Sequence, residues 1–229
     1  MIRDRTFIFI GFQLFLTIIL IKINGLEVLN LYYGVKIGSI PMLYFVYIGQ
    51  FINLCMYMFG GVEEYLTGYG IYTLIRLDKR TQLQKKIKTL LLKKLLIYEL
   101  AKAGICCFIS LFFSHAQLQL EKVVAGLVFT FIVNYICLIF QAILEIKVSA
   151  RIGVLITSSL YIAMLLLPDL LMMGDKSLIY FMFLIPNLSM CNRVDLSYKT
   201  YFVIMIWFTF IIICLWSIFM RMINKKDIF

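Results

Sequence analysis

Charged residues are scarce in this sequence. Asp, Glu, Lys and Arg make up 15% of its 229 residues, whereas they account for about 25% of an ordinary soluble domain. Apolar residues make up 63%, which is more apolar surface than a water-soluble fold of this length can bury. The composition therefore excludes a water-soluble domain and predicts one integral membrane domain that covers residues 1–229.

Residues that commonly bind metals or act in catalysis are scarce too. His115 is the single histidine, and none of the six cysteines forms a Cys-x-x-Cys pair. Five of the cysteines lie inside apolar runs, where a cysteine is usually a small buried apolar residue. We therefore expect no metal site, no disulfide framework and no cofactor bound by this chain.

Six apolar runs are close to the length that a membrane span requires. A helix needs about 20 residues to cross some 30 Å of hydrocarbon, and lipid offers no partner for unpaired backbone groups. The runs are continuous rather than alternating, which excludes a transmembrane barrel. We predict an all-α membrane protein with six transmembrane helices at about residues 7–23, 40–60, 95–114, 123–144, 152–173 and 200–220.

The positive charges predict how the chain is oriented. Fifteen of the 22 lysines and arginines fall before the first run, between the second and third, between the fourth and fifth, or after the last. Cytoplasmic segments carry such an excess, so we expect both termini in the cytoplasm of a multi-pass protein of the cell membrane. The net charge of +10 then follows from membrane orientation, and no nucleic-acid partner is expected.

Two connections are longer than simple turns. Residues 61–94, on the expected inner side, carry apolar residues at helical spacing and lysines mainly on the other face. They predict an amphipathic basic helix from Leu77 onward, which either binds anionic lipid along the inner membrane face or meets a cytoplasmic partner.

On the outer side, residues 174–199 contain an apolar stretch, 177–187, that is too short to cross the membrane. We expect it to re-enter the membrane or lie at its surface, and to end at Pro186 and Asn187.

Polar side chains inside the runs are candidates for a functional site. They either form hydrogen bonds between helices or line a polar path between subunits. Glu99 and Lys102 share a helix face and can neutralise each other, whereas the role of Asp169, near the outer end of the fifth run, stays open. The five uncharged candidates for a path are Gln13, Gln50, Asn53, Asn134 and Gln141.

A Glu-x-x-x-Gly motif, Glu64 to Gly68, follows the second run and precedes an apolar stretch and the basic helix. With six runs in this order, the layout resembles that of the ABC-2 type permeases, the membrane subunits of ATP-driven exporters. The resemblance covers nearly the whole chain in layout. The family usually has a proline-containing stretch after the glycine, whereas residues 71–76 here contain no proline. In size the chain is similar to permeases of bacteriocin or peptide export and self-immunity systems.

The resemblance implies partners. The chain has no Gly-x-x-x-x-Gly-Lys-Ser/Thr phosphate loop, so ATP and Mg²⁺ would bind to a separate cytoplasmic ABC ATPase, expected in two copies. A second permease copy or a related permease would complete the pathway in a bacterial plasma membrane. The expected substrate is amphipathic: a peptide or antimicrobial, a lipid or a drug. The coupling segment would be 61–94, and the residues expected nearest the ATPase are Glu64, Gly68, Arg76, Lys79 and Arg80.

Three other functions stay open at this point. An immunity or scaffold protein that binds a toxin or a sensor kinase without transport would have the same composition. Glu63 and Glu64 resemble the paired glutamates of CAAX-protease-like membrane peptidases, but Gly68 stands where those enzymes have arginine, and one histidine leaves too few groups for their chemistry. A subunit of the energy-coupling-factor type would share the inner Ala150-Arg151, but its paired coupling motifs are missing.

Overall fold

The computed structural model describes residues 2–24, 32, 34–39, 41–66, 80–113, 120–171, 182–190, 192–193 and 198–225. All secondary structure in these ranges is helical. Two short elements are α3 (Glu63–Leu66) and the 3-10 helix η2 (Ile185–Ser189). Six long helices make up nearly all of the rest: α1 (Ile2–Asn24), α2 (Pro41–Met58), α5 (Arg80–Phe113), α6 (Leu120–Lys147), α7 (Ala150–Leu170) and α9 (Tyr198–Lys225).

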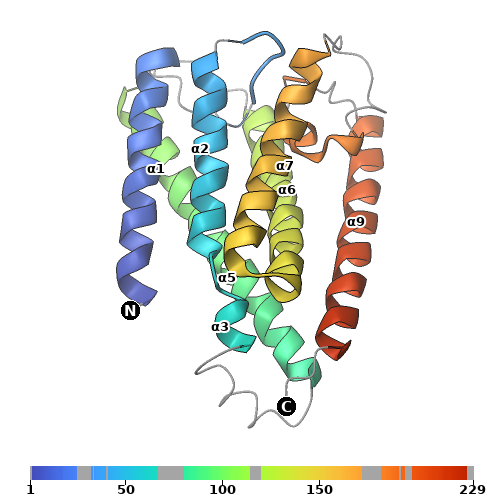
Figure 1. The fold of residues 1–229 in the computed structure, drawn as a ribbon. Coiled ribbons are helices and arrows are strands. Elements are labelled where there is room, and N and C mark those ends of the chain that lie inside the picture. Colours follow the sequence, from blue (N-terminus) through green and yellow to red (C-terminus); the bar gives the residue numbers. More distant parts are fainter. Residues whose placement is uncertain are drawn as a thin grey trace.

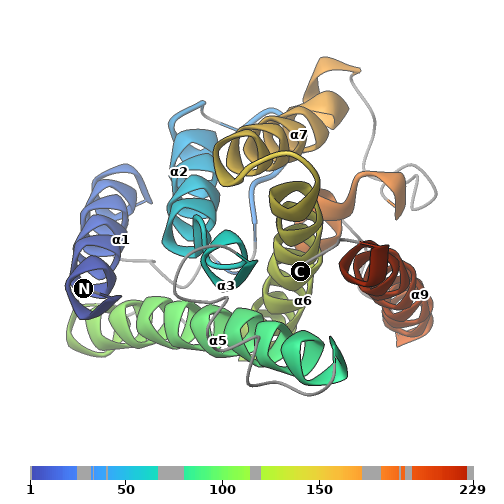
Figure 2. The same cartoon turned by 60° about the horizontal axis from the view of Figure 1, so that its bottom comes forward.

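The long helices form one bundle in which successive helices run in opposite directions (Figure 1). We call the end where α1 begins and α9 ends the inner end, and the opposite end the outer end. Seen from the inner end, α6 lies among α5, α7 and α9 (Figure 2), and it packs against all three as well as against η2. Helix α1 packs on α2 and α5 at the edge of the bundle.

Four of the helices are apolar and long enough to cross a membrane: α2, residues Val123–Lys147 of α6, α7, and residues Lys199–Ile223 of α9. Large apolar side chains also point away from the bundle, among them Phe7, Phe45 and Phe202, which are each about 70% exposed. A soluble monomer does not expose so many. The chain is therefore an all-helical membrane protein.

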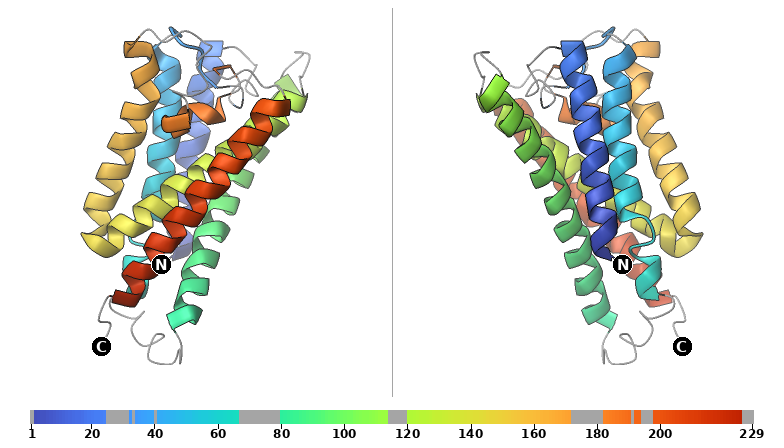
Figure 3. Two further views of the ribbon diagram at one scale, coloured as in Figure 1. Left: turned by 90° about the vertical axis from the view of Figure 1, so that its right-hand side faces the viewer. Right: turned by 90° about the vertical axis from the view of Figure 1, so that its left-hand side faces the viewer.

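Each expected apolar run coincides with a helix, but the basic segment after the second run has a different form. Residues 80–94 and the third run together make one helix, α5, of 34 residues. The reason is a buried stripe that continues without a break at four-residue spacing, Leu83, Ile87, Leu91 and Leu95. No separate helix lies across the inner face over residues 80–94. Instead, α5 continues beyond the inner ends of α1, α2, α6 and α7 (Figure 3).

Two close approaches fix the outer connections. Gly126 of α6 lies so close to the backbone of Tyr32 that a Cβ there would overlap the Tyr32 carbonyl oxygen. Gly34 has a φ of 81° and lies directly against Met190. Glycine is required at both positions, at the first for space and at the second also for its backbone conformation. The connection between α1 and α2 is thereby held against α6 and the segment that contains η2.

Candidate functional site

The turn that enters the expected coupling segment is fixed to the turn between α6 and α7. Glu145, near the end of α6, accepts a hydrogen bond from the Val62 amide at 3.1 Å. Its other oxygen accepts one from Gln141 Nε2, also at 3.1 Å. Glu63 in turn accepts a hydrogen bond from the Ala150 amide at 3.0 Å. Because Ala150 begins α7, a carboxylate there is also favoured by the dipole of that helix.

A cation on α5 binds the end of α2, just before this turn. Lys94 Nζ lies 3.5 Å from the Tyr57 carbonyl oxygen, near the end of α2, and 5.5 Å from the centre of the Tyr57 ring. A positive charge is favourable at the C-terminus of a helix. We call Glu63, Lys94, Gln141 and Glu145 the inner clamp. It links the end of α2 to α5, α6 and α7, so that a displacement of this turn acts on three helices.

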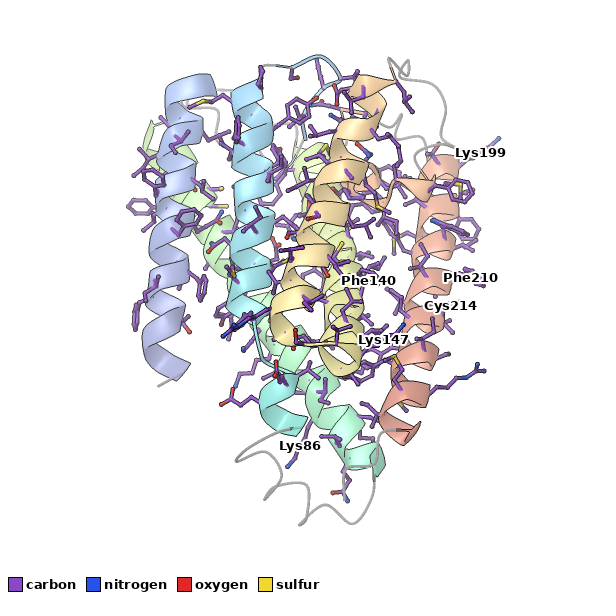
Figure 4. The ribbon with its side chains drawn as sticks, viewed as in Figure 1. Lys86, Phe140, Lys147, Lys199, Phe210 and Cys214 are labelled. Carbon is purple, nitrogen blue, oxygen red and sulfur yellow. The ribbon has the colours of Figure 1, made fainter. Side chains whose placement is uncertain are left out.

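The residues expected nearest an ATPase are described only in part. Glu64 is exposed beside the inner clamp, and Arg80 is the first residue of α5. Gly68, Arg76 and Lys79 lie outside the described residues. Lys86 and Lys147 lie toward the inner end, whereas Lys199 lies at the outer end (Figure 4). Among the side chains that the structure describes, the exposed basic ones at the inner end are Lys85, Lys86, Lys88, Lys93, Lys147, Arg151 and Arg221.

The comparisons with known proteins give one result. A family model described as "Protein of unknown function (DUF2705)" matches residues 3–229. The chain belongs to the DUF2705 family. No curated protein and no solved structure matches it.

In this DUF2705 protein, a second group of polar side chains is centred on Tyr98 of α5. The Tyr98 hydroxyl points its hydrogen toward Gln13 Oε1 and the carbonyl oxygen of Gln50, each 2.8 Å away. It accepts a hydrogen bond from Asn53 Nδ2 at 3.3 Å, and that amide also donates to the Phe9 carbonyl oxygen. Two of the amides expected in the path, Gln13 and Asn53, therefore meet at one tyrosine, which also bonds the main chain of Gln50, and together they join α1, α2 and α5 inside a single chain.

The other two amides bind carboxylates of the same chain. Asn134 Nδ2 donates to Glu99 Oε1 at 2.6 Å, and Gln141 donates to Glu145 within the inner clamp. Glu99 and Lys102 form the ion pair that their spacing predicts, with 3.7 Å between Glu99 Oε2 and Lys102 Nζ, and both are about 95% buried. All five amides lie inside the bundle. That they line a path stays a prediction.

The aromatic neighbour of this ion pair is Tyr32, whose ring centre lies 5.1 Å from Lys102 Nζ. Burial raises the pKa of the Tyr32 hydroxyl well above its ordinary value, with a smaller contribution from nearby acidic groups. The phenol therefore stays neutral and offers its ring face to the ammonium group. Lys102 is thus held by a carboxylate on its own helix and by the connection between α1 and α2.

The third group lies at the outer end and is built around Arg193, which is 1% exposed. Nε donates to the Val35 carbonyl oxygen at 2.7 Å, and Nη1 donates to the Leu165 carbonyl oxygen at 3.0 Å and to Asn187 Oδ1. Nη2 donates to the Tyr44 hydroxyl at 2.7 Å and to Asp169 Oδ2 at 3.0 Å. All five N–H groups of the guanidinium therefore have an acceptor.

Asp169, whose role the sequence left open, completes this group. Its Oδ1 accepts hydrogen bonds from the Gly38 amide at 2.8 Å and the Tyr44 hydroxyl at 2.7 Å. Asn187 donates in turn to the Met164 carbonyl oxygen of α7 at 2.7 Å. We call Tyr44, Asp169, Asn187 and Arg193 the outer lock. It fastens η2 and the residues after it to α2 and α7. Pro186 is the second residue of the 3-10 helix, and residues 177–181 of the expected apolar stretch lie outside the described residues.

Tyr98, Glu145 and Arg193 were not singled out from the sequence. In the sequence, Tyr98 is one of many aromatic residues and Arg193 is one of several charged residues on the expected outer side. Glu145 lies just after the end of a predicted span. One signal could have indicated the outer lock: Asp169 follows an apolar stretch, where a carboxylate needs a cation. Across the described residues, no group of three His, Cys, Asp or Glu could hold a metal. The three polar groups hold segments of the chain together by hydrogen bonds at the inner end, in the middle and at the outer end of the bundle.

Proposed function

We propose that this chain is the membrane subunit of an ATP-driven exporter of the ABC-2 type. It would cross the plasma membrane of a bacterium six times, with both termini in the cytoplasm. A separate ABC ATPase would bind at the inner end in two copies, and two permease copies, or this chain and a related permease, would form the pathway. The proposed cargo is an amphipathic peptide, lipid or drug.

Charge and helix length support this orientation. Seven of the described basic side chains are exposed at the inner end, whereas Lys36 and Lys199 are exposed on the outer side. An α-helix of 34 residues, the length of α5, measures about 51 Å, against some 30 Å of hydrocarbon. The surplus therefore favours a part of α5 that stands in the cytoplasm and presents its lysines there.

The inner clamp is the observation that carries the proposal. A partner that pushed on residues 61–79 would act on a turn bonded to α6 and α7 through Glu145 and Glu63, directly after the end of α2 that Lys94 of α5 binds. A lipid-anchoring segment needs no such bonds to three helices. This arrangement suits the transfer of a nucleotide-driven movement from a cytoplasmic subunit into the bundle.

Co-expression with an ATPase encoded in an adjacent reading frame tests the proposal. The double variant Arg76→Glu with Arg80→Glu should reduce ATPase co-purification and substrate-stimulated ATP hydrolysis. Lys199→Glu, a charge reversal at the outer end, is the matched control and should change neither. Stable purification of the wild-type chain with no ATPase bound, or equal yields for both variants, would instead favour a non-transporting immunity or scaffold protein.

A further inference from the structure

A small cavity lies in the middle of the bundle, where α2, α5, α6, α7 and η2 meet. Its volume is about 20 Å³, and its lining includes Gln50, Lys102, Asn134, Tyr161 and Ser189. A buried water molecule needs about 10–15 Å³ of such space and two to four polar partners. The cavity is therefore large enough for one water molecule and too small for an organic ligand.

Gln50 brings an unused hydrogen-bond donor to this cavity. Its side chain is 95% buried, and its Nε2 has no acceptor among the described residues. The bond to Tyr98 uses the main-chain carbonyl oxygen of Gln50 and not its side-chain nitrogen. A buried amide without an acceptor is costly, and ordered water is the usual partner when no protein group is within reach.

The ion pair beside the cavity is longer than a direct hydrogen bond. Asn134 and Lys102, both in the cavity lining, are the two partners of the Glu99 carboxylate. Glu99 Oε2 has no hydrogen-bond donor among the described residues, and Lys102 Nζ is 3.7 Å from it. A direct hydrogen bond between an ammonium and a carboxylate measures about 2.7–2.9 Å. Polar contacts longer than about 3.5 Å are commonly bridged by water.

We propose that the cavity is a binding site for a single water molecule, which accepts hydrogen bonds from Gln50 Nε2 and Lys102 Nζ. The water gives the unpaired amide nitrogen its acceptor and lies beside the Glu99–Lys102 ion pair. Ser189 of η2 lines the same cavity, so the segment fastened by the outer lock forms part of its wall. The site does not depend on whether an ATPase drives the protein.

Two measurements on the full chain in lipid nanodiscs test the site. A density map that resolves ordered water should contain one peak at hydrogen-bond distance from Gln50 Nε2. Radiolytic hydroxyl labelling, which marks side chains next to bound water, should modify Tyr98 and Tyr161 in the lining. In Gln50→Met, which keeps the side-chain length and removes the donor, both the peak and most of this labelling should be lost.

Thr157→Val is the matched control, because the Thr157 hydroxyl is also buried without a partner among the described residues but does not line the cavity. It should leave the peak and the labelling in place. A wild-type map with no peak at Gln50 Nε2, or with this amide bonded directly to a protein acceptor, would overturn the proposal. So would labelling of Tyr98 and Tyr161 that is the same in Gln50→Met. If Gln50→Met does not fold, the wild-type map decides.

Discussion

Arg193→Met should release the segment that contains η2 from the outer end of the bundle. Methionine has a similar length but no donor, so the variant loses all five hydrogen bonds of the guanidinium at once. The Asp169 carboxylate then has no cation, although its side chain is 21% exposed and gains some hydration. The carbonyl oxygens of Val35 and Leu165 also lose their donor.

The expected loss follows from these unpaired groups. Removing one partner of a buried ion pair costs about 3–5 kcal/mol, because the other charge and its acceptors stay buried. Asp169→Asn should cost less, about 1–3 kcal/mol, since Asn keeps an acceptor for the Gly38 amide. Arg221→Met, at an exposed arginine of the inner end, is the matched control and should change the free energy of unfolding by less than about 0.5 kcal/mol.

The two tryptophans provide separate reporters for the assay. Trp207 donates to the Met182 carbonyl oxygen near η2, whereas Trp216 donates to the Tyr135 hydroxyl in the inner half of the bundle. Unfolding of each single-tryptophan protein in mixed micelles, followed by fluorescence, gives a local and a distant signal. In Arg193→Met the Trp207 transition should move to lower denaturant and the Trp216 transition should move less.

Equal stability of Arg193→Met and the wild-type protein at both tryptophans would refute this reasoning. Such a result would mean that the guanidinium is solvated in the folded protein and that its five acceptors have other partners. A shift of equal size in Arg221→Met would also contradict it, because the loss would then follow from charge alone.

Three further substitutions test the packing and the other two polar groups, each by the free energy of unfolding. Tyr98→Phe removes the hydroxyl shared by the amides of Gln13 and Asn53 and the main-chain carbonyl of Gln50, and should cost about 1–3 kcal/mol; no loss would show that these groups pair without it. Gly126→Ala should cost about 1–3 kcal/mol because its Cβ meets the Tyr32 backbone, whereas Gly104→Ala, with nothing within 4 Å, should be neutral or slightly stabilising. Glu63→Ala should cost about 0.5–2 kcal/mol by removing the acceptor at the start of α7, and Glu63→Gln should keep much of it; equal effects would contradict that role.

The positions of the helices could be predicted because a membrane permits few structures. Apolar runs of about 20 residues must be helical in lipid, and each of the six runs coincides with a helix of the bundle. The form of α5 could not be predicted in the same way. Its lysines indicate a separate surface helix. Instead, the third helix extends toward the inner end, because four apolar side chains are buried against the bundle there: Leu83, Ile87, Leu91 and Leu95.

The polar groups were predictable as residues and not as pairs. A buried amide needs a hydrogen-bond partner, so the sequence identifies Gln13 and Asn53 as candidates for bonds between helices. The spacing of Glu99 and Lys102 predicts an ion pair. No pattern in the sequence identifies Tyr98 as the common partner of these two amides. Arg193 and Asp169 are 24 residues apart, so their pairing depends on how the outer connection folds back onto α7, which no local pattern specifies.

The central claim, that a cytoplasmic ATPase acts on the inner end of this bundle, is tested most directly by photo-crosslinking in intact membranes. A benzophenone side chain introduced at Lys86, exposed on α5, should form an adduct with the co-expressed ATPase, and one at Lys199, exposed at the outer end, should not. No adduct at Lys86, in membranes where both proteins are present, or adducts of equal yield at both positions, would contradict the account.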